Sequence, residues 1–241
     1  MNPDAPGRAL VLAKKIENSL KKTTIDVVIA PPFPFLALIN PFLKKLKLGA
    51  QDVFWEDIGP YTGEVSWHQL KHLRVSHVII GHAERRIYLG ETDAMINKKI
   101  SAVTKAGLIS LFAVGEKEKT DFEKRKYYID EQVRAGLKGI SQNDFKKGVI
   151  VYEPVWAIGT GNNATPEDAR VASNIIRDTL KKLWHQETVT TPILYGGSVN
   201  AKNALSFIHP EKGNMDGLLV GGASIDPKGF VAIIESASRK K

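Results

Sequence analysis

Residues 148–161 read Gly-Val-Ile-Val-Tyr-Glu-Pro-Val-Trp-Ala-Ile-Gly-Thr-Gly. The run from Val149 to Tyr152 is continuously apolar, which is typical of a strand buried on both faces. Pro154 disfavours helical geometry in the residue before it, so the strand should end with Glu153 at its tip. A carboxylate beneath the apolar, glycine-closed loop that follows suits a general base under a lid that excludes water. A solvated glutamate beside a packing tryptophan is the alternative on this stretch alone.

Outward from this stretch, short apolar runs alternate with amphipathic ones along the whole chain. The expected strands are 25–30, 46–51, 77–81, 109–114, 149–153, 192–195 and 217–220, and the expected helices are 9–21, 35–45, 66–73, 92–106, 120–139, 166–184, 201–207 and 227–236. This alternation predicts parallel βαβ units in one α/β domain over residues 1–241. Seven strands and eight helices fit either an open doubly wound sheet or a (β/α)8 barrel that lacks one strand.

Composition restricts the class of protein. Hydrophobic residues make up 43% and charged residues 25% of the 241 residues, which is usual for a soluble globular protein. The chain has no cysteine and no metal-ligand cluster, so we expect neither a metal nor a cofactor. Its start has no signal-peptide character and no apolar run approaches a membrane span, so we expect a cytoplasmic protein without membrane partners. The net charge of +8 can steer anionic substrates, but no nucleic-acid motif accompanies it.

A histidine follows another expected strand. The strand 77–81 runs into Gly81-His82, and His82 would stand at the amino end of a short helix. The helix dipole there disfavours the imidazolium, so a neutral imidazole could polarise a substrate carbonyl. A structural histidine is the alternative for this step alone. The run Glu84-Arg85-Arg86, taken alone, is typical of a salt-bridged surface turn.

The last two expected strands both end in glycines. Tyr195 is followed by Gly196-Gly197-Ser198, and the final strand by Gly221-Gly222. Such turns let backbone amides approach an anion at a helix start, although each alone is also a common tight turn. Two of them on the last strands match the place where barrels bind phosphate.

Together these features predict one reaction class. A carboxylate base beside a neutral hydrogen-bond donor suits proton removal from a carbon next to a carbonyl, because the donor stabilises the enediolate. The glycine turns predict a small phosphorylated carbonyl substrate, and the lid would keep the enediol from losing its phosphate.

The chain resembles the triosephosphate isomerase family over nearly its whole length. The matching motifs are Ala30-Pro31-Pro32, Gly49-Ala50-Gln51, Tyr61-Thr62-Gly63-Glu64-Val65-Ser66, Gly81-His82-Ala83-Glu84-Arg85-Arg86, residues 152–161, residues 195–199 and Gly221-Gly222. The resemblance implies interconversion of glyceraldehyde 3-phosphate and dihydroxyacetone phosphate, a step of glycolysis and gluconeogenesis. It makes Glu153 the base and His82 the electrophile, the known division of roles in that family.

The resemblance also implies supporting roles. Gly159, Ser198, Gly221 and Gly222 match the phosphate contacts, and Tyr195 matches the residue that latches the closed lid over 154–161. Thr62 matches the tip of a loop that enters a neighbouring subunit, so the resemblance implies a homodimer or a larger homo-oligomer.

The sequence departs from the family at its start. Family members open with a strand ending in Asn-x-Lys-Met-Asn or a close variant, and Met1-Asn2 aligns with its last two residues. The resemblance therefore predicts that the first strand and the catalytic lysine are absent, which would leave Glu84 without its usual partner. The exposed edges of 25–30 and 217–220 would then face a gap closed by contraction, by the N-terminal segment or by oligomer contacts. A catalytically impaired relative that binds small phosphates or acts as a scaffold is the alternative function.

Overall fold

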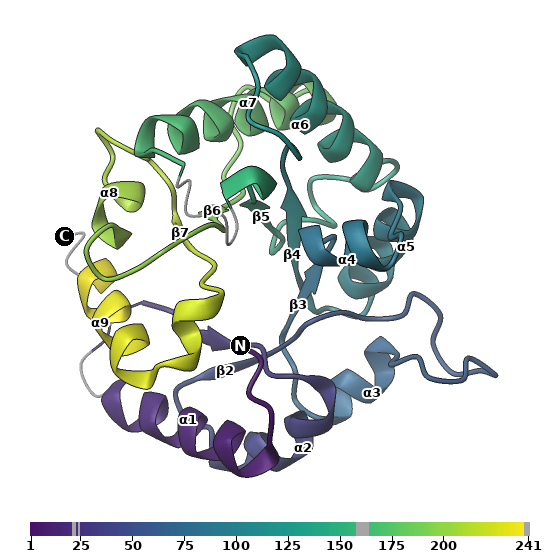
Figure 1. Ribbon diagram of the computed structural model, residues 1–241. Coiled ribbons are helices and arrows are strands. Elements are labelled where there is room, and N and C mark those ends of the chain that lie inside the picture. The colour runs from purple at the N-terminus through teal and green to yellow at the C-terminus, as the bar shows by residue number, and fades with distance from the viewer. Residues whose placement is uncertain (21–22, 24, 158–163, 239–241) are drawn as a thin grey trace.

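The computed structural model describes residues 1–20, 23, 25–157 and 164–238 (Figure 1). The strands are β1 (Val28–Ile29), β2 (Lys47–Ala50), β3 (His77–Ile80), β4 (Ile109–Val114), β5 (Val149–Tyr152), β6 (Ile193–Tyr195) and β7 (Gly217–Leu218). The α-helices are α1 (Pro6–Ser19), α2 (Leu36–Ile39), α3 (Trp67–His72), α4 (Ala83–Tyr88), α5 (Asp93–Lys105), α6 (Phe122–Gly136), α7 (Pro166–Trp184), α8 (Ala204–Ile208) and α9 (Pro227–Ser238).

The seven strands form one sheet in chain order, β1 to β7, and every pairing between neighbours is parallel. The sheet curls round a centre, and the helices lie outside it (Figure 1). A doubly wound sheet would reverse its strand order at a switch point, so the sequential order excludes that architecture. The expected parallel α/β barrel arrangement with seven strands is confirmed.

The expected count of eight helices is wrong, because the described residues contain nine. The ninth is α4, the short helix that was expected directly after His82 but not included in the count. The helix expected over 35–45 is also shorter than the pattern suggested. Only Leu36–Ile39 is α-helical there, and 3-10 turns that include Pro34 and Pro41 flank it, because proline lacks the N–H that a continuing helix needs.

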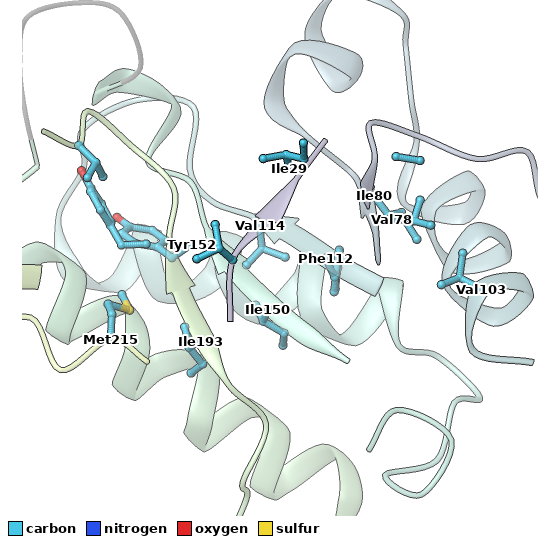
Figure 2. Close-up of a cluster of buried hydrophobic side chains, with 14 of the residues drawn as sticks. Ile29, Val78, Ile80, Val103, Phe112, Val114, Ile150, Tyr152, Ile193 and Met215 are labelled. Carbon is cyan, nitrogen blue, oxygen red and sulfur yellow. The ribbon is translucent and has the colours of Figure 1, made fainter. Parts of the chain in front are cut away.

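Alternate residues of the strands pack into two separate layers. Val78, Ile80, Phe112, Val114, Ile150 and Tyr152 face the helices and belong to the main core (Figure 2). Their neighbours Leu111, Ala113 and Val151 face the inside of the curled sheet, where Ile79, Val149 and Leu194 pack against them. This division follows from the two-residue repeat of a strand, whose side chains point alternately to opposite faces.

The sheet has two edges, one at β1 and one at β7. Residues 1–5 lead into α1 without forming a strand, and no described residue pairs with the outer edge of either strand. A cavity of about 1220 Å³ lies between the two edges. Within the described residues, the sheet does not contract enough to pair β1 with β7, and the N-terminal segment forms no strand between them. No helix among the described residues is long and apolar enough to cross a membrane.

Candidate active site

Glu153 follows β5 directly, and its side chain is 3% exposed. Two glycines make room for it. A methyl group on Gly115 would lie 2.0 Å from the Glu153 carbonyl oxygen, and one on Gly196 would lie 2.9 Å from Glu153 Cγ. Both separations are too short for a side chain larger than hydrogen. The glycine after β6, expected to serve an anion, therefore also shapes the carboxylate's position.

His82 lies opposite this carboxylate as the N-cap residue of α4. Its Nδ1 accepts a hydrogen bond from the Glu84 backbone N–H at 3.3 Å, so the proton of the neutral ring resides on Nε2. That Nε2 lies 3.4 Å from Glu153 Oε1. The Ala83 backbone N–H donates to Glu153 Oε2 at 3.1 Å, so both carboxylate oxygens face the start of α4.

Burial raises the pKa of Glu153 above its ordinary value. His82, the Ala83 N–H and Arg86 act in the opposite direction and do not cancel the desolvation. A carboxylate whose pKa is raised toward neutrality is a better proton acceptor than an ordinary glutamate. The electrostatics thus agree with the role of base that the sequence predicts.

A buried charge network fixes the helix that carries His82. Lys99 Nζ donates to Asp52 Oδ1 at 2.7 Å and also bonds to Glu91. Arg85, on α4, reaches Asp52 Oδ2 at 2.7 Å and lies 3.5 Å from Glu91 Oε1. Burial raises the pKa of Asp52, while the two cations oppose that effect. These partners were not predicted from the sequence, in which the run Glu84-Arg85-Arg86 taken alone indicates a salt-bridged surface turn.

A second buried group holds the segment after Glu153. Glu116 Oε1 accepts hydrogen bonds from Tyr152 Oη at 2.9 Å and from Trp156 Nε1 at 3.0 Å. Arg125 Nε lies 3.1 Å from the same oxygen, and Arg125 Nη2 donates to Asp168 at 3.1 Å. Asp168 belongs to the capping box of α7, so this group connects both sides of the predicted lid. The sequence offered one indication, since Gly115-Glu116 also follows a strand directly.

The predicted phosphate contacts are only partly described. Ser198 Oγ donates to the Ala157 carbonyl at 3.1 Å, which joins the β6 turn to the start of the lid. Gly221 and Gly222 line the cavity, and a methyl group on either would meet nothing within 4 Å. Their backbone is thus accessible to a ligand from this side. Gly159 lies outside the described residues.

The three supporting residues lie in different settings. Glu84 is 64% exposed, and its carboxylate lies 3.8 Å from His82 Nδ1. Tyr195 is buried and stacks on Phe207, and its Oη has no hydrogen-bond partner within the part of the chain that the structure describes. Thr62 lies away from the others, exposed on the loop that projects between β2 and α3 (Figure 1).

A family model described as "Triosephosphate isomerase" matches residues 1–237. The chain belongs to the triosephosphate isomerase family. Three relatives named triosephosphate isomerase cover most of it. That of Dictyoglomus thermophilum is 46% identical over 215 residues, 88% of this chain and 86% of the relative. That of Caldanaerobacter subterraneus subsp. tengcongensis is 41% identical over 233 residues, which are 95% of this chain and 93% of the relative. That of Geobacter metallireducens is 44% identical over 218 residues, which are 89% of this chain and 86% of the relative.

Membership of the triosephosphate isomerase family places the chain among the isomerases and implies a phosphorylated triose as substrate. It agrees with the curled parallel sheet and its outer helices. The roles of individual residues stay predictions.

Proposed function

We propose that this chain interconverts glyceraldehyde 3-phosphate and dihydroxyacetone phosphate. The observation that carries the proposal is the facing pair formed by Glu153 Oε1 and His82 Nε2, which follow β5 and β3 and lie 3.4 Å apart. A base and a hydrogen-bond donor so close together can act on adjacent atoms of one small substrate.

The chemistry is a proton transfer between two carbons. Glu153 removes the proton from the carbon next to the substrate carbonyl, and the C–H electron pair forms the carbon–carbon double bond of an enediolate. The carbonyl oxygen gains the negative charge, and the Nε2–H of His82 donates a hydrogen bond to it. The proton of the hydroxyl on the first carbon passes to the former carbonyl oxygen by way of His82 Nε2, which gives its proton to that oxygen and takes up the hydroxyl proton. Glu153 delivers the abstracted proton to the former carbonyl carbon, and the other oxygen becomes the new carbonyl, so protons and electrons balance.

The phosphate and lid complete the proposal. Backbone amides of Gly159, Gly221 and Gly222, with Ser198, would hold the phosphate, and residues 154–161 would close over it. Glu116 supports this arrangement because its carboxylate bonds Trp156 at the start of that segment. Tyr195 would latch the closed lid, consistent with a buried hydroxyl that lacks a described partner. Exclusion of water would protect the enediol phosphate.

A homodimer is part of the proposal. Ile58 on the projecting loop is 77% exposed and Tyr88 at the end of α4 is 78% exposed, and a partner subunit would cover such apolar surface. Thr62 would then reach the partner's active site. A cytoplasmic location stays a prediction.

The deciding experiment measures the interconversion of the two triose phosphates by the chain and by Glu153→Gln. We expect Glu153→Gln to lower kcat/KM by about 10²–10⁴-fold, because the amide cannot accept the proton. Glu118→Gln, which changes an exposed carboxylate, is the matched control and should leave kcat/KM unchanged.

A second outcome would favour the impaired, phosphate-binding or scaffold alternative. Arg86 is the guanidinium that acts on the Glu153 charge, and it is already bonded to the Gly81 carbonyl at 2.9 Å and to Asp93 at 2.6 Å. A folded parent chain without activity would show that the site lacks a cation that the reaction needs.

A further inference from the structure

Two histidine rings converge on the short helix α3, which follows the projecting loop (Figure 1). His68 and His72 are four positions apart, so their side chains lie on one face of the helix, about one turn apart. Their Nε2 atoms are 3.2 Å apart. Both rings reach solvent, and 41% of the His68 side chain is exposed. An ion in solution therefore has access to both nitrogens.

The separation of the two nitrogens is that of two ligands on one metal ion. Zinc–nitrogen bonds are about 2.0–2.1 Å long, so two ligating nitrogens lie about 3.4 Å apart at a tetrahedral angle and about 2.9 Å apart at a right angle. The observed separation of 3.2 Å falls between these values. Two imidazole lone pairs this close repel each other unless a proton or a metal ion lies between them. The pair thus calls for a cation.

Asp57, on the projecting loop, determines which nitrogen of His68 is free to bind. Its Oδ1 lies 3.6 Å from His68 Nδ1. The carboxylate favours a proton on Nδ1, which leaves the lone pair of the neutral ring on Nε2, facing His72. A carboxylate behind a ligating histidine is the usual outer partner at metal sites, where it fixes the ring and raises its basicity.

The helical turn that carries the pair is already fixed by its own contacts. Ser66 and Gln69 form a capping box at the start of α3, and Leu70 is fully buried. The Trp67 ring packs edge-on against the His68 ring, with centroids 5.6 Å apart. Binding of an ion therefore needs little ordering of the backbone, which keeps its entropic cost low.

The surrounding groups define an open site. Lys71 is the nearest cation in sequence, but its Nζ donates to the Ala106 carbonyl at 3.0 Å, whereas Asp57 supplies negative charge behind His68. Among the described residues, no three His, Cys, Asp or Glu side chains gather where they could hold an ion together. Water must therefore fill the remaining positions of an ion bound to the histidine pair, and its affinity is moderate.

We propose that His68 and His72 bind one divalent transition-metal ion between their Nε2 atoms. Imidazole suits Zn²⁺, Ni²⁺ and Cu²⁺, whereas Mg²⁺ and Ca²⁺ prefer oxygen ligands. The ion joins successive turns of α3 and, through Asp57, restrains the base of the projecting loop. The unfolded chain holds the two rings at no fixed separation, so the ion favours the folded chain and stabilises it.

Isothermal titration calorimetry with ZnCl₂, in a buffer that does not coordinate metals, tests the site. We expect one ion per chain with a dissociation constant on the order of 10 μM. His72→Gln removes one ligand and should weaken this binding at least about tenfold, and Asp57→Asn should weaken it about tenfold by freeing the His68 ring. MgCl₂ should give no binding at the same concentrations.

The matched control removes a histidine elsewhere. His185 is exposed and has a φ of 53°, a left-handed conformation that asparagine tolerates. His185→Asn should bind Zn²⁺ as the parent chain does. Circular dichroism verifies that each variant is folded, and any ion held by the other histidines persists in His72→Gln and is subtracted.

Two further readouts locate the ion. Cu²⁺ bound to His68 should quench the fluorescence of the neighbouring Trp67, and Trp67→Phe should remove that quenched signal. Zn²⁺ at tenfold its dissociation constant should raise the Tm of the parent by about 2–5 °C and leave that of His72→Gln unchanged. Equal Zn²⁺ affinity of the parent and His72→Gln, or no binding below millimolar Zn²⁺, would overturn the proposal and leave a proton shared between the rings. None of these measurements uses isomerase activity, so the outcome does not depend on the proposed function.

Discussion

Lys99 is a buried side chain whose contacts hold the start of the helix beside His82, the proposed electrophile. Its side chain is 3% exposed, and it bonds Asp52 and Glu91, which are themselves buried. Arg85 contacts the same two carboxylates from α4, the helix that begins just after His82. The network therefore holds the helix start that faces Glu153.

Replacement of Lys99 by methionine should be strongly destabilising. Methionine keeps much of the side-chain volume but leaves Asp52 and Glu91 with Arg85 as their remaining cation. Breaking a buried pair by removing one partner costs about 3–5 kcal/mol in free energy of unfolding. We expect a loss of about 3 kcal/mol, because Arg85 compensates in part. Urea denaturation at neutral pH measures it.

The neighbouring Lys98 supplies the matched control for this prediction. Its side chain is exposed, and its ammonium lies 5.2 Å from the Trp55 ring centroid. Lys98→Met removes the same charge from the same helix and should change the free energy of unfolding by less than about 1 kcal/mol. Similar losses in the two variants would contradict a structural role for the buried network.

Residues differ in how far sequence alone can assign them. The positions of Glu153 and His82 at strand ends were predictable, because each comes after an apolar run and the carboxyl ends of parallel strands meet at one end of the barrel. Lys99 and Asp52 are 47 positions apart and belong to no local pattern. Their pairing depends on how helices pack against strands, which local sequence does not determine.

At the scale of elements, Glu116 joins several parts of the barrel. It follows β4 and bonds Tyr152 at the end of β5 and Trp156 in the 3-10 turn Val155–Ala157. Arg125 of α6 connects this carboxylate to Asp168 of α7. One buried group therefore couples two strands and two helices on either side of the predicted lid.

Glu116→Gln tests this coupling. Glutamine retains an acceptor oxygen but removes the charge that faces the buried Arg125. A hydrogen bond to a charged group contributes about 1.5–3 kcal/mol, so we expect the free energy of unfolding to fall by about 2 kcal/mol. Urea denaturation measures the change, and Glu118→Gln, two positions along on the surface, should be nearly neutral. Equal stability of Glu116→Gln and the parent chain would contradict the coupling.

The elements themselves were predicted unevenly from sequence. Long helices with clear caps, such as α7 with its Thr165 cap and Pro166, begin where the sequence indicates. The short α4 was expected after His82 but was not included in the count of eight, because six residues are too few to show a helical repeat. The edge strands β1 and β7 are shorter than the apolar runs in the sequence. Each pairs on one side only, so its length is set by the residues that pair with that single neighbour.

For the whole molecule, pH is expected to change stability through His77. This residue begins β3 and is buried, and it also lines the cavity between β1 and β7. Burial, aided by Lys47, lowers the pKa of His77 from 6.5 to about 4. Its ring must therefore lose its proton for the chain to fold at moderately acidic pH, and global stability depends on that proton.

The sign follows from proton binding in the two states. Between pH 6.5 and 4 the unfolded chain holds a proton on His77 that the folded chain does not, so stability falls as the pH is lowered through this window. The free energy of unfolding is not reduced by this group above about pH 6.5, and it falls as the pH is lowered toward 4. The loss caused by His77 reaches about 3 kcal/mol once the pH is below the pKa of the folded chain.

Denaturation of the parent chain and of His77→Gln at pH 7 and pH 4.5 measures this contribution. Glutamine carries no titratable proton, so its stability should change less between the two pH values, even if the substitution itself lowers stability at both. The exposed His72→Gln should retain the parent's pH dependence. If His77→Gln lost as much stability between these two pH values as the parent does, His77 would not be the source of the acid sensitivity. Carboxylates such as Asp168 and Asp130, whose pKa values are lowered by hydrogen bonds and by their arginine partners, have an acid sensitivity of their own. Their stabilisation is lost at lower pH than that of His77, because a carboxylate with a lowered pKa takes up its proton only below the ordinary carboxyl range. The pH at which the parent and His77→Gln curves separate therefore distinguishes a buried imidazole from paired carboxylates.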